Sequence, residues 1–480
     1  MRAAQYGKPA PTYANGVSRR DVILLGLTFA VLIAALVKPS YYPRSDSALF
    51  EYFGRAMLHG QRLYIDEWDT KLPSIYLINE LWQKCFGDRY QLHSIAETIV
   101  SAFTAVPLFA LILRKTGVRK WALATLCFAA TYALIPGEMN TTENYAAPLL
   151  LGAVFAAFSN RNLVAGFCAA LAVTFWIPSC LILIPVIAYE ADANERRAVF
   201  ISFAVTLVAY AISIAGIMAV NLPELFGGWT RYVFRDNAIS GSTSSGSPLG
   251  VLHFLYSGVV ISGAGIWLSA LAVVLRRPRG RLEWFAILWV GSALLGAAAS
   301  GRFYADYFVP LIAPLIFSSF VLASSAKIAP VRWVFVAVAL ILCWRTGVAS
   351  VEDYRSGTQE AKEIAALAHA INSVAGTGAV VSVDAYVPAV YLAANAYPVN
   401  RLGVVHLSNY VKIDKLGSRD PVLILASSES TSPSLPAGFA QLCRRQFGSE
   451  WHLKLYAAPG MQAPPGVCDE EKAGLALDAK

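Results

Sequence analysis

The chain has 480 residues, of which 56% are hydrophobic and only 15% are charged. Soluble globular domains usually carry about 25% charged residues, so this composition is typical of a protein embedded for most of its length in a lipid bilayer. It argues against a cytosolic enzyme, a disordered chain and a nucleic-acid-binding protein. The net charge of +8 is explained by basic residues in cytoplasmic loops.

Apolar stretches long enough to form membrane helices recur along the first 350 residues. A helix needs about 20 apolar residues to cross a bilayer, and fewer where it is broken. The sequence predicts about eleven spans, near residues 21–37, 91–113, 121–136, 145–158, 162–175, 178–189, 198–218, 251–275, 283–299, 307–323 and 333–349. The fifth and sixth are short and meet at Trp176, Ile177 and Pro178, which predicts a broken helical hairpin.

The basic residues indicate how these spans are oriented. If the N-terminus is cytoplasmic, the cytoplasmic segments hold 17 Lys and Arg in 52 residues, against 10 in 102 residues of the opposite loops. This is the asymmetry that membrane proteins show between their two sides. An odd number of spans then places residues 351–480 outside the cytoplasm. The first span lacks a small-x-small cleavage site, so we expect it to be retained.

The residues after about 350 are no longer apolar throughout, which predicts two domains. Residues 1–350 form a transmembrane domain, and residues 351–480 form a small extracytoplasmic α/β domain. Periodicity predicts helices over 354–374 and 387–395 and strands at 379–384, 421–426 and 452–456. The fold class is therefore an α-helical polytopic membrane protein with about eleven transmembrane helices and a small C-terminal α/β domain.

Seven cysteines and six histidines are scattered along the chain. They form no CxxC motif and no metal-ligand spacing, so no metal is expected. Cys443 and Cys468 lie 25 residues apart in the polar tail. Because disulfides form in oxidising compartments, an extracytoplasmic tail would allow these two residues to pair.

Charged and aromatic residues gather in the outer loops, which makes these loops the predicted site. Loops 38–90, 137–144 and 219–250 carry most of the twelve acidic residues found on that side before the tail. Long loops are where functional groups collect. Within the first loop, residues 47–58 can form an amphipathic helix that lies on the membrane surface.

Two places in the first outer loop are candidates for chemistry. Asp46 follows the first span closely, near the depth of the lipid headgroups, although Asp is also a favoured N-cap for the helix at 47–58. Asp69 and Lys71, in the segment WDTKLP, place an acid and a base two residues apart. A solvated surface pair is the alternative interpretation of these two residues.

Two further candidates lie at the ends of later spans. Glu138 and Glu143 flank the start of the fourth span, where Glu143 can equally be a helix-terminal charge. The segment GRFYADY follows the ninth span, where basic and aromatic residues often serve as interfacial anchors. Its candidate binding residues are Arg302, Tyr304, Asp306 and Tyr307.

The order of these motifs carries a family resemblance. One span is followed by an Asp, an amphipathic loop helix with a terminal Gly, the motif D-x-K-x-P, and an aromatic helix ending in Phe-Gly. Later come N-x-x-E-N-Y and G-R-F-Y-x-x-Y-x-x-x-L-x-x-P. This order resembles the bacterial integral-membrane glycosyltransferases of the GT-C superfamily, relatives of the protein O-mannosyltransferases and of the aminoarabinose transferase for lipid A.

The resemblance implies transfer of a hexosyl or pentosyl group from a polyprenyl-phosphate donor to a lipid, glycan or protein acceptor, at the outer face of the cell inner membrane. Asp46 takes the place of the family's catalytic aspartate, and Lys71 that of the basic residue near the donor phosphate. Glu138 or Glu143 lies in the loop that supplies a second acid. Two departures are Leu72, where relatives have Pro, and Asp306, where many relatives have His.

The chemistry of such a transfer suits these residue types. The leaving group, a polyprenyl phosphate, departs without being protonated, unlike the alkoxide in glycoside hydrolysis. One carboxylate that deprotonates the acceptor hydroxyl and one cation that holds the phosphate therefore suffice. A single displacement of this kind inverts the anomeric carbon, and it requires no metal or other cofactor.

Three other functions are weighed against this one. A transporter or flippase of a lipid-linked sugar would be expected to show internal repeats or charges near the bilayer midplane, and the sequence has neither. A lipid-linked oligosaccharide polymerase or ligase would also use charges in outer loops, but more often an arginine pair in a very long late loop. A non-enzymatic scaffold is the third alternative, and a polyprenyl monophosphate sugar trapped in the purified protein would discriminate among all of these functions.

Overall fold

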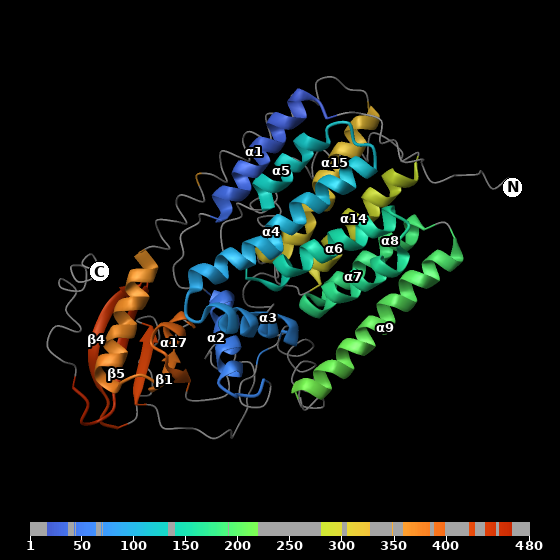
Figure 1. Cartoon of the computed structure of the whole chain (residues 1–480). Coiled ribbons are helices and arrows are strands. Elements are labelled where there is room, and N and C mark those ends of the chain that lie inside the picture. The colour runs from blue at the N-terminus through green and yellow to red at the C-terminus, as the bar shows by residue number, and fades with distance from the viewer. Residues whose placement is uncertain are drawn as a thin grey trace. The chain divides into compact units, whose positions relative to one another are not determined.

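The computed structural model of the chain separates into two compact units, which are described one by one (Figure 1). The bundle unit contains Met1–Lys38, Ile95–Ile212 and Ile239–Ser350, and the sheet unit contains Pro39–Ser94, Ser213–Ala238 and Val351–Lys480. The structure describes residues 17–36, 43, 45–63, 69, 71–132, 140–190, 192–218, 280–299, 305–326, 348, 359–384, 388–398, 422–427, 437–447 and 451–462. The predicted boundary at residue 350 stays a prediction.

Helices account for the described part of the bundle unit. They are α1 (Arg19–Leu36), α4 (Tyr90–Lys115), α5 (Trp121–Tyr132), α6 (Thr142–Phe158), α7 (Asn162–Phe175), η1 (Ile177–Ile182), α8 (Leu183–Tyr189), α9 (Ala193–Met218), α14 (Arg281–Ala298), η3 (Ala305–Phe308) and α15 (Val309–Ala326). The first residues of α4 and the last residues of α9 belong to the sheet unit. Each predicted span within the described residues coincides with one or two of these helices, whereas the spans at 251–275 and 333–349 lie outside them.

Three of the described helices are long and apolar enough to cross a membrane. They are Tyr90–Lys115, Ala193–Gly216 and Arg281–Ala298. Shorter apolar helices are Trp121–Tyr132, Asn162–Phe175, Ile177–Tyr189 and Val309–Val321. Helix α9 exposes a series of large apolar side chains, among them Phe200, Val205 and Ile212, as expected of a helix whose face contacts lipid.

The predicted break between the fifth and sixth spans is confirmed. Helix α7 ends at Phe175, and Trp176 has an extended backbone before the 3-10 helix η1. Pro178 lies in the first turn of η1, where a missing backbone N–H costs no hydrogen bond. The bundle packs closely beside this break, because a Cβ atom at Gly296 of α14 would lie 3.1 Å from the Trp176 ring.

The first outer loop forms a helical hairpin within the sheet unit. Helix α2 (Ser45–Leu58) packs against α3 (Pro73–Phe86), and a Cβ atom at Gly54 would lie only 2.6 Å from backbone atoms of Asn79 and Glu80. The helix expected at 47–58 is therefore confirmed. Its expected amphipathic surface position is wrong, since residues 47–56 of α2 are buried all round by protein.

A five-stranded sheet lies in the C-terminal part of the sheet unit. Its strands are β1 (Val380–Asp384), β2 (Tyr397–Pro398), β3 (Leu423–Ser427), β4 (Ala440–Phe447) and β5 (Trp451–Ala457), in the order β2-β1-β3-β5-β4. Strand β1 is parallel to β2 and β3, and β5 is antiparallel to β3 and β4. The predicted strands at 379–384, 421–426 and 452–456 correspond to β1, β3 and β5, while β2 and β4 were not predicted.

Helices accompany the strands of this sheet. A helix covers residues 359–375, where periodicity predicted one, and α17 (Ala389–Ala393) follows Pro388 in the short helix predicted at 387–395. Cys443 in β4 is buried and disulfide-bonded. Its predicted partner Cys468 lies outside the described residues, so that pairing stays a prediction.

Candidate functional site

Asp46 lies in the first turn of α2, one residue inside the helix that begins at Ser45. Its side chain is exposed, unlike those of the ten residues that follow it. A carboxylate in this turn is favoured by the helix dipole. The fold therefore presents Asp46 as an exposed acid at the start of a helix whose next ten residues are buried.

Asp69 is buried, with 3% exposure, so the interpretation of Asp69 and Lys71 as a fully solvated pair is wrong for the acid. The hydroxyl of Tyr76 donates a hydrogen bond to Asp69 Oδ2 at 2.6 Å. The fully buried Tyr76 ring contacts Phe50 and Phe53 of α2, with centroid distances of 5.9 Å and 5.0 Å. Asp69 thus anchors the loop segment to the α2–α3 hairpin.

Lys71 is half-buried and comes directly before the N-terminus of α3. Leu72 is the N-cap of this helix and provides no side-chain hydrogen bond, and Pro73 occupies its first turn. The first N–H groups of a helix carry a partial positive charge. The positive charge of Lys71 and the partial positive charge of the α3 N-terminus are therefore close together in the chain.

Glu143 lies in the first turn of α6 in the bundle unit and is 2% exposed. Thr141 caps this helix, because its hydroxyl oxygen accepts a hydrogen bond from the backbone N–H of Asn144 at 3.3 Å. Among the residues that the structure describes, nothing donates a hydrogen bond to Oε1 of Glu143. Glu138, the other candidate in this loop, lies outside the described residues.

The remaining candidates precede α15 in the sequence. Arg302 and Tyr304 fall outside the described residues, whereas Asp306 and Tyr307 belong to the 3-10 helix η3. Tyr307 is half-buried. The structure therefore places Asp46, Asp69 and Lys71 in the sheet unit and Glu143, Asp306 and Tyr307 in the bundle unit. In the described part of the chain, no three His, Cys, Asp or Glu residues are grouped as metal ligands.

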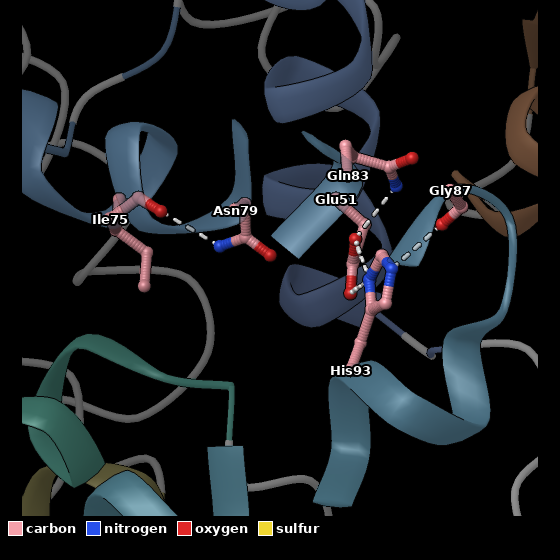
Figure 2. A network of polar contacts seen from close by, with 6 residues as sticks. All are labelled: Glu51, Ile75, Asn79, Gln83, Gly87 and His93. Atoms are coloured by element: carbon pink, nitrogen blue, oxygen red, sulfur yellow. Dashed lines mark hydrogen bonds and ion pairs between the residues drawn. The ribbon is translucent and has the colours of Figure 1, made fainter. Parts of the chain in front are cut away.

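Sequence reasoning missed a buried polar network that includes Glu51 of α2, the helix that also carries Asp46 (Figure 2). His93 Nδ1 lies 2.8 Å from both carboxylate oxygens of Glu51, and its Nε2 lies 2.8 Å from the carbonyl oxygen of Gly87. Gln83 Nε2 donates a hydrogen bond to Glu51 Oε2 at 3.0 Å. The signal in the sequence is the position of Glu51 between the aromatic residues Phe50 and Tyr52, where a solvated charge is not expected.

Arg55 was also missed, and it connects α2 to α17. Its guanidinium group is buried and donates hydrogen bonds to the carbonyl oxygens of Leu392 at 3.0 Å and Tyr391 at 2.7 Å. These carbonyls belong to the last turn of α17 and also accept hydrogen bonds from the backbone N–H groups of Asn395 and Ala396. The contact joins residues 336 and 337 positions apart, so no local pattern in the sequence could reveal it.

Comparisons with known proteins give the fold of the chain. No protein-family model and no curated protein sequence matches it. Among solved structures, it is similar to ArnT from Cupriavidus metallidurans bound to undecaprenyl phosphate, with a TM-score of 0.56 and 13% identity over 92% of this chain and 99% of that one. The apo state of the same enzyme gives a TM-score of 0.58 and 12% identity, covering 92% and 98% of the two chains.

This likeness shows that the chain has the same fold as ArnT. The structural resemblance expected from the motifs is thus confirmed at the level of the fold. At 12–13% identity the comparison assigns no role to any single residue.

Proposed function

We propose that this chain is a membrane glycosyltransferase of the GT-C type that uses a sugar linked to a polyprenyl phosphate. The observation that carries the proposal is the likeness over 92% of the chain to a structure that binds undecaprenyl phosphate. The reaction is transfer of a hexosyl or pentosyl group to a lipid, glycan or protein acceptor, with inversion at the anomeric carbon. Fold alone does not fix function, so the proposal also depends on the residues of the first outer loop.

Asp46 acts as the general base in this proposal. A general base must reach the proton of the acceptor hydroxyl, and Asp46 is an exposed acid at the edge of a buried helix. The neighbouring buried acid of α2, Glu51, is already bonded to His93 and Gln83. Of these two acids of α2, Asp46 is thus the exposed one.

Lys71 holds the donor phosphate in this proposal. Its ammonium group and the N-terminus of α3 both favour an anion. Asp69 acts through the fold, because its hydrogen bond with Tyr76 fixes the segment that carries Lys71. Arg302, Tyr304, Asp306 and Tyr307 are proposed to complete the binding of donor and acceptor.

Glu143 is the proposed second acid of the site, with Glu138 as the alternative. A buried carboxylate oxygen without a donor is costly and is explained if a substrate hydroxyl supplies the missing hydrogen bond. Among the described residues, Oε1 of Glu143 is a buried oxygen to which nothing donates a hydrogen bond.

The proposed topology follows from the distribution of basic residues. The chain has eleven spans in the cell inner membrane, a cytoplasmic N-terminus, and an extracytoplasmic α/β domain over residues 351–480 in which Cys443 pairs with Cys468. A reporter enzyme fused after residue 480 tests this topology. Activity of that reporter only in the cytoplasm would contradict it.

The proposed donor is tested by the lipid that the protein retains. The chain is purified from membranes in mild detergent, and bound lipids are identified by mass spectrometry. We expect a polyprenyl monophosphate sugar, reduced in Lys71→Ala and unchanged in Lys84→Ala, since Lys84 is an exposed lysine that pairs with Glu80 within α3. Retention of a polyprenyl diphosphate oligosaccharide would contradict the proposal and favour a polymerase or ligase.

A further inference from the structure

Four segments of the sheet unit meet at the side chain of His93 (Figure 2). Glu51 comes from the middle of α2, Gln83 from the last turn of α3, Gly87 from the turn after α3, and His93 from the first turn of α4. Glu51 and His93 are each 1% exposed. The network is therefore a buried connection between the helix that carries Asp46 and the two helices that follow it.

The geometry of the network fixes its proton count. The Gly87 carbonyl oxygen can only accept, so His93 Nε2 must carry a proton. The hydrogen bond between Nδ1 and Glu51 needs one further proton, which lies either on Nδ1 of an imidazolium or on the Glu51 carboxyl group. In both arrangements the pair has no net charge, which is what burial in a poorly solvated interior requires.

The surroundings of the ring favour a rigid arrangement. The ring of His93 contacts Phe86 and Tyr90, with centroid distances of 5.9 Å and 5.4 Å. Both ring nitrogens and both carboxylate oxygens of Glu51 have partners. Fully satisfied buried networks of this kind hold the segments that they join in a single arrangement.

We propose that Glu51 and His93 are positioning residues for sugar transfer, which fix α2 against the α3–α4 turn and thereby set the position of Asp46. This inference depends on the proposed function, because it assumes that Asp46 is the base. Neither residue contacts substrate. Asp46 lies on the same helix five residues before Glu51, so a shift or tilt of α2 at Glu51 displaces Asp46.

The test compares variants that keep or break the geometry. Glu51→Gln preserves one hydrogen bond to each partner in a neutral form: its amide N–H donates to His93 Nδ1, its amide oxygen accepts from Gln83, and His93 Nε2–H still donates to Gly87. Glu51→Asp keeps the charge but shortens the side chain, so that α2 must move to reach His93. His93→Phe keeps the ring packing and removes both hydrogen bonds.

The variants are purified in detergent, and kcat, the KM for the polyprenyl-phosphate sugar and the melting temperature are measured for each. We expect Glu51→Gln to retain kcat within about threefold, and Glu51→Asp and His93→Phe to lower kcat by about tenfold to a hundredfold with little change in KM, as misplacing a catalytic group by about 1 Å does. Lys84→Ala, which breaks an exposed ion pair on α3, is the control and keeps kcat.

Wild-type kcat in a stably folded Glu51→Asp or His93→Phe protein would overturn the proposal, and if His93→Phe does not fold, Glu51→Asp decides alone. Loss of kcat in a stable Glu51→Gln protein would also overturn it, because the charge of Glu51 rather than its geometry would then be required. Failure of the proposed function is a separate result: Asp46→Asn would transfer sugar at the wild-type rate.

Discussion

Two buried acids, Glu51 in the sheet unit and Glu143 in the bundle unit, differ in their partners. They are 1% and 2% exposed. Glu51 has His93 and Gln83 on its two oxygens, whereas Oε1 of Glu143 has no hydrogen-bond partner among the described residues. An unpaired buried polar group costs about 1–3 kcal/mol. The comparison therefore separates an acid whose oxygens are paired within the fold from one that has an unpaired oxygen.

The largest effect that sharpens this comparison is expected from Glu143→Gln. If Glu143 binds a substrate hydroxyl or proton, the variant should lose transfer activity by about 10²-fold or more, with its melting temperature in detergent unchanged. Glu51→Gln, the same change at the satisfied acid, should retain activity. The comparison fails if Glu143→Gln transfers sugar at the wild-type rate, which would make Glu143 a helix-terminal charge only.

Lys71→Ala is expected to have the next largest effect. Loss of a half-buried ammonium–phosphate contact should weaken donor binding by about 2–5 kcal/mol, while Lys71→Arg should keep part of the affinity. Titration with a polyprenyl-phosphate sugar measures this directly. The exposed Lys84–Glu80 pair, with an N–O distance of 2.6 Å, supplies the control, because such i,i+4 pairs contribute only about 0.3–0.5 kcal/mol. Equal losses in Lys71→Ala and Lys84→Ala would mean that the loop is only a general positive surface.

Gly54→Ala is expected to have the smallest effect on the free energy of unfolding, about 1–3 kcal/mol. Its methyl group would lie 2.6 Å from backbone atoms of α3, so α2 and α3 must separate. Thermal unfolding in detergent measures the loss. Gly26→Ala is the control, because a Cβ atom at that position would have no atom within 4 Å. A Gly54→Ala protein as stable as the wild type would show that α2 is not held closely on α3, and would weaken the account of Glu51 as a fixed acid.

The spans were predictable because crossing a bilayer requires long apolar segments with their own hydrogen bonds. Helix α9 and the break at Pro178 follow from local composition and from the chemistry of proline. Strand β4 was missed because Arg444 and Arg445 interrupt the alternation of apolar residues. Its antiparallel pairing with β5 is a long-range property of the sheet.

The site was predictable only in part. Asp46 and Lys71 could be selected because an acid and a base stood out in a loop beside a span. The burial of Asp69 and the bonds of Glu51 and Arg55 could not be predicted, because their partners lie in other helices and their burial depends on tertiary packing. His93 is 42 residues from Glu51, and the carbonyl groups that bind Arg55 are 336 and 337 residues away. The missed residues Glu51, His93 and Arg55 each take part in a hydrogen bond between α2 and another segment.

The measurement that tests the central claim most directly is sugar transfer by Asp46→Asn, made together with its melting temperature and donor affinity. Asn has a similar size and is also favoured at helix starts, so the fold should be kept. If Asp46 is the general base, transfer should fall by about 10²–10⁴-fold while the donor still binds. Transfer at the wild-type rate by a stable Asp46→Asn protein would contradict the account.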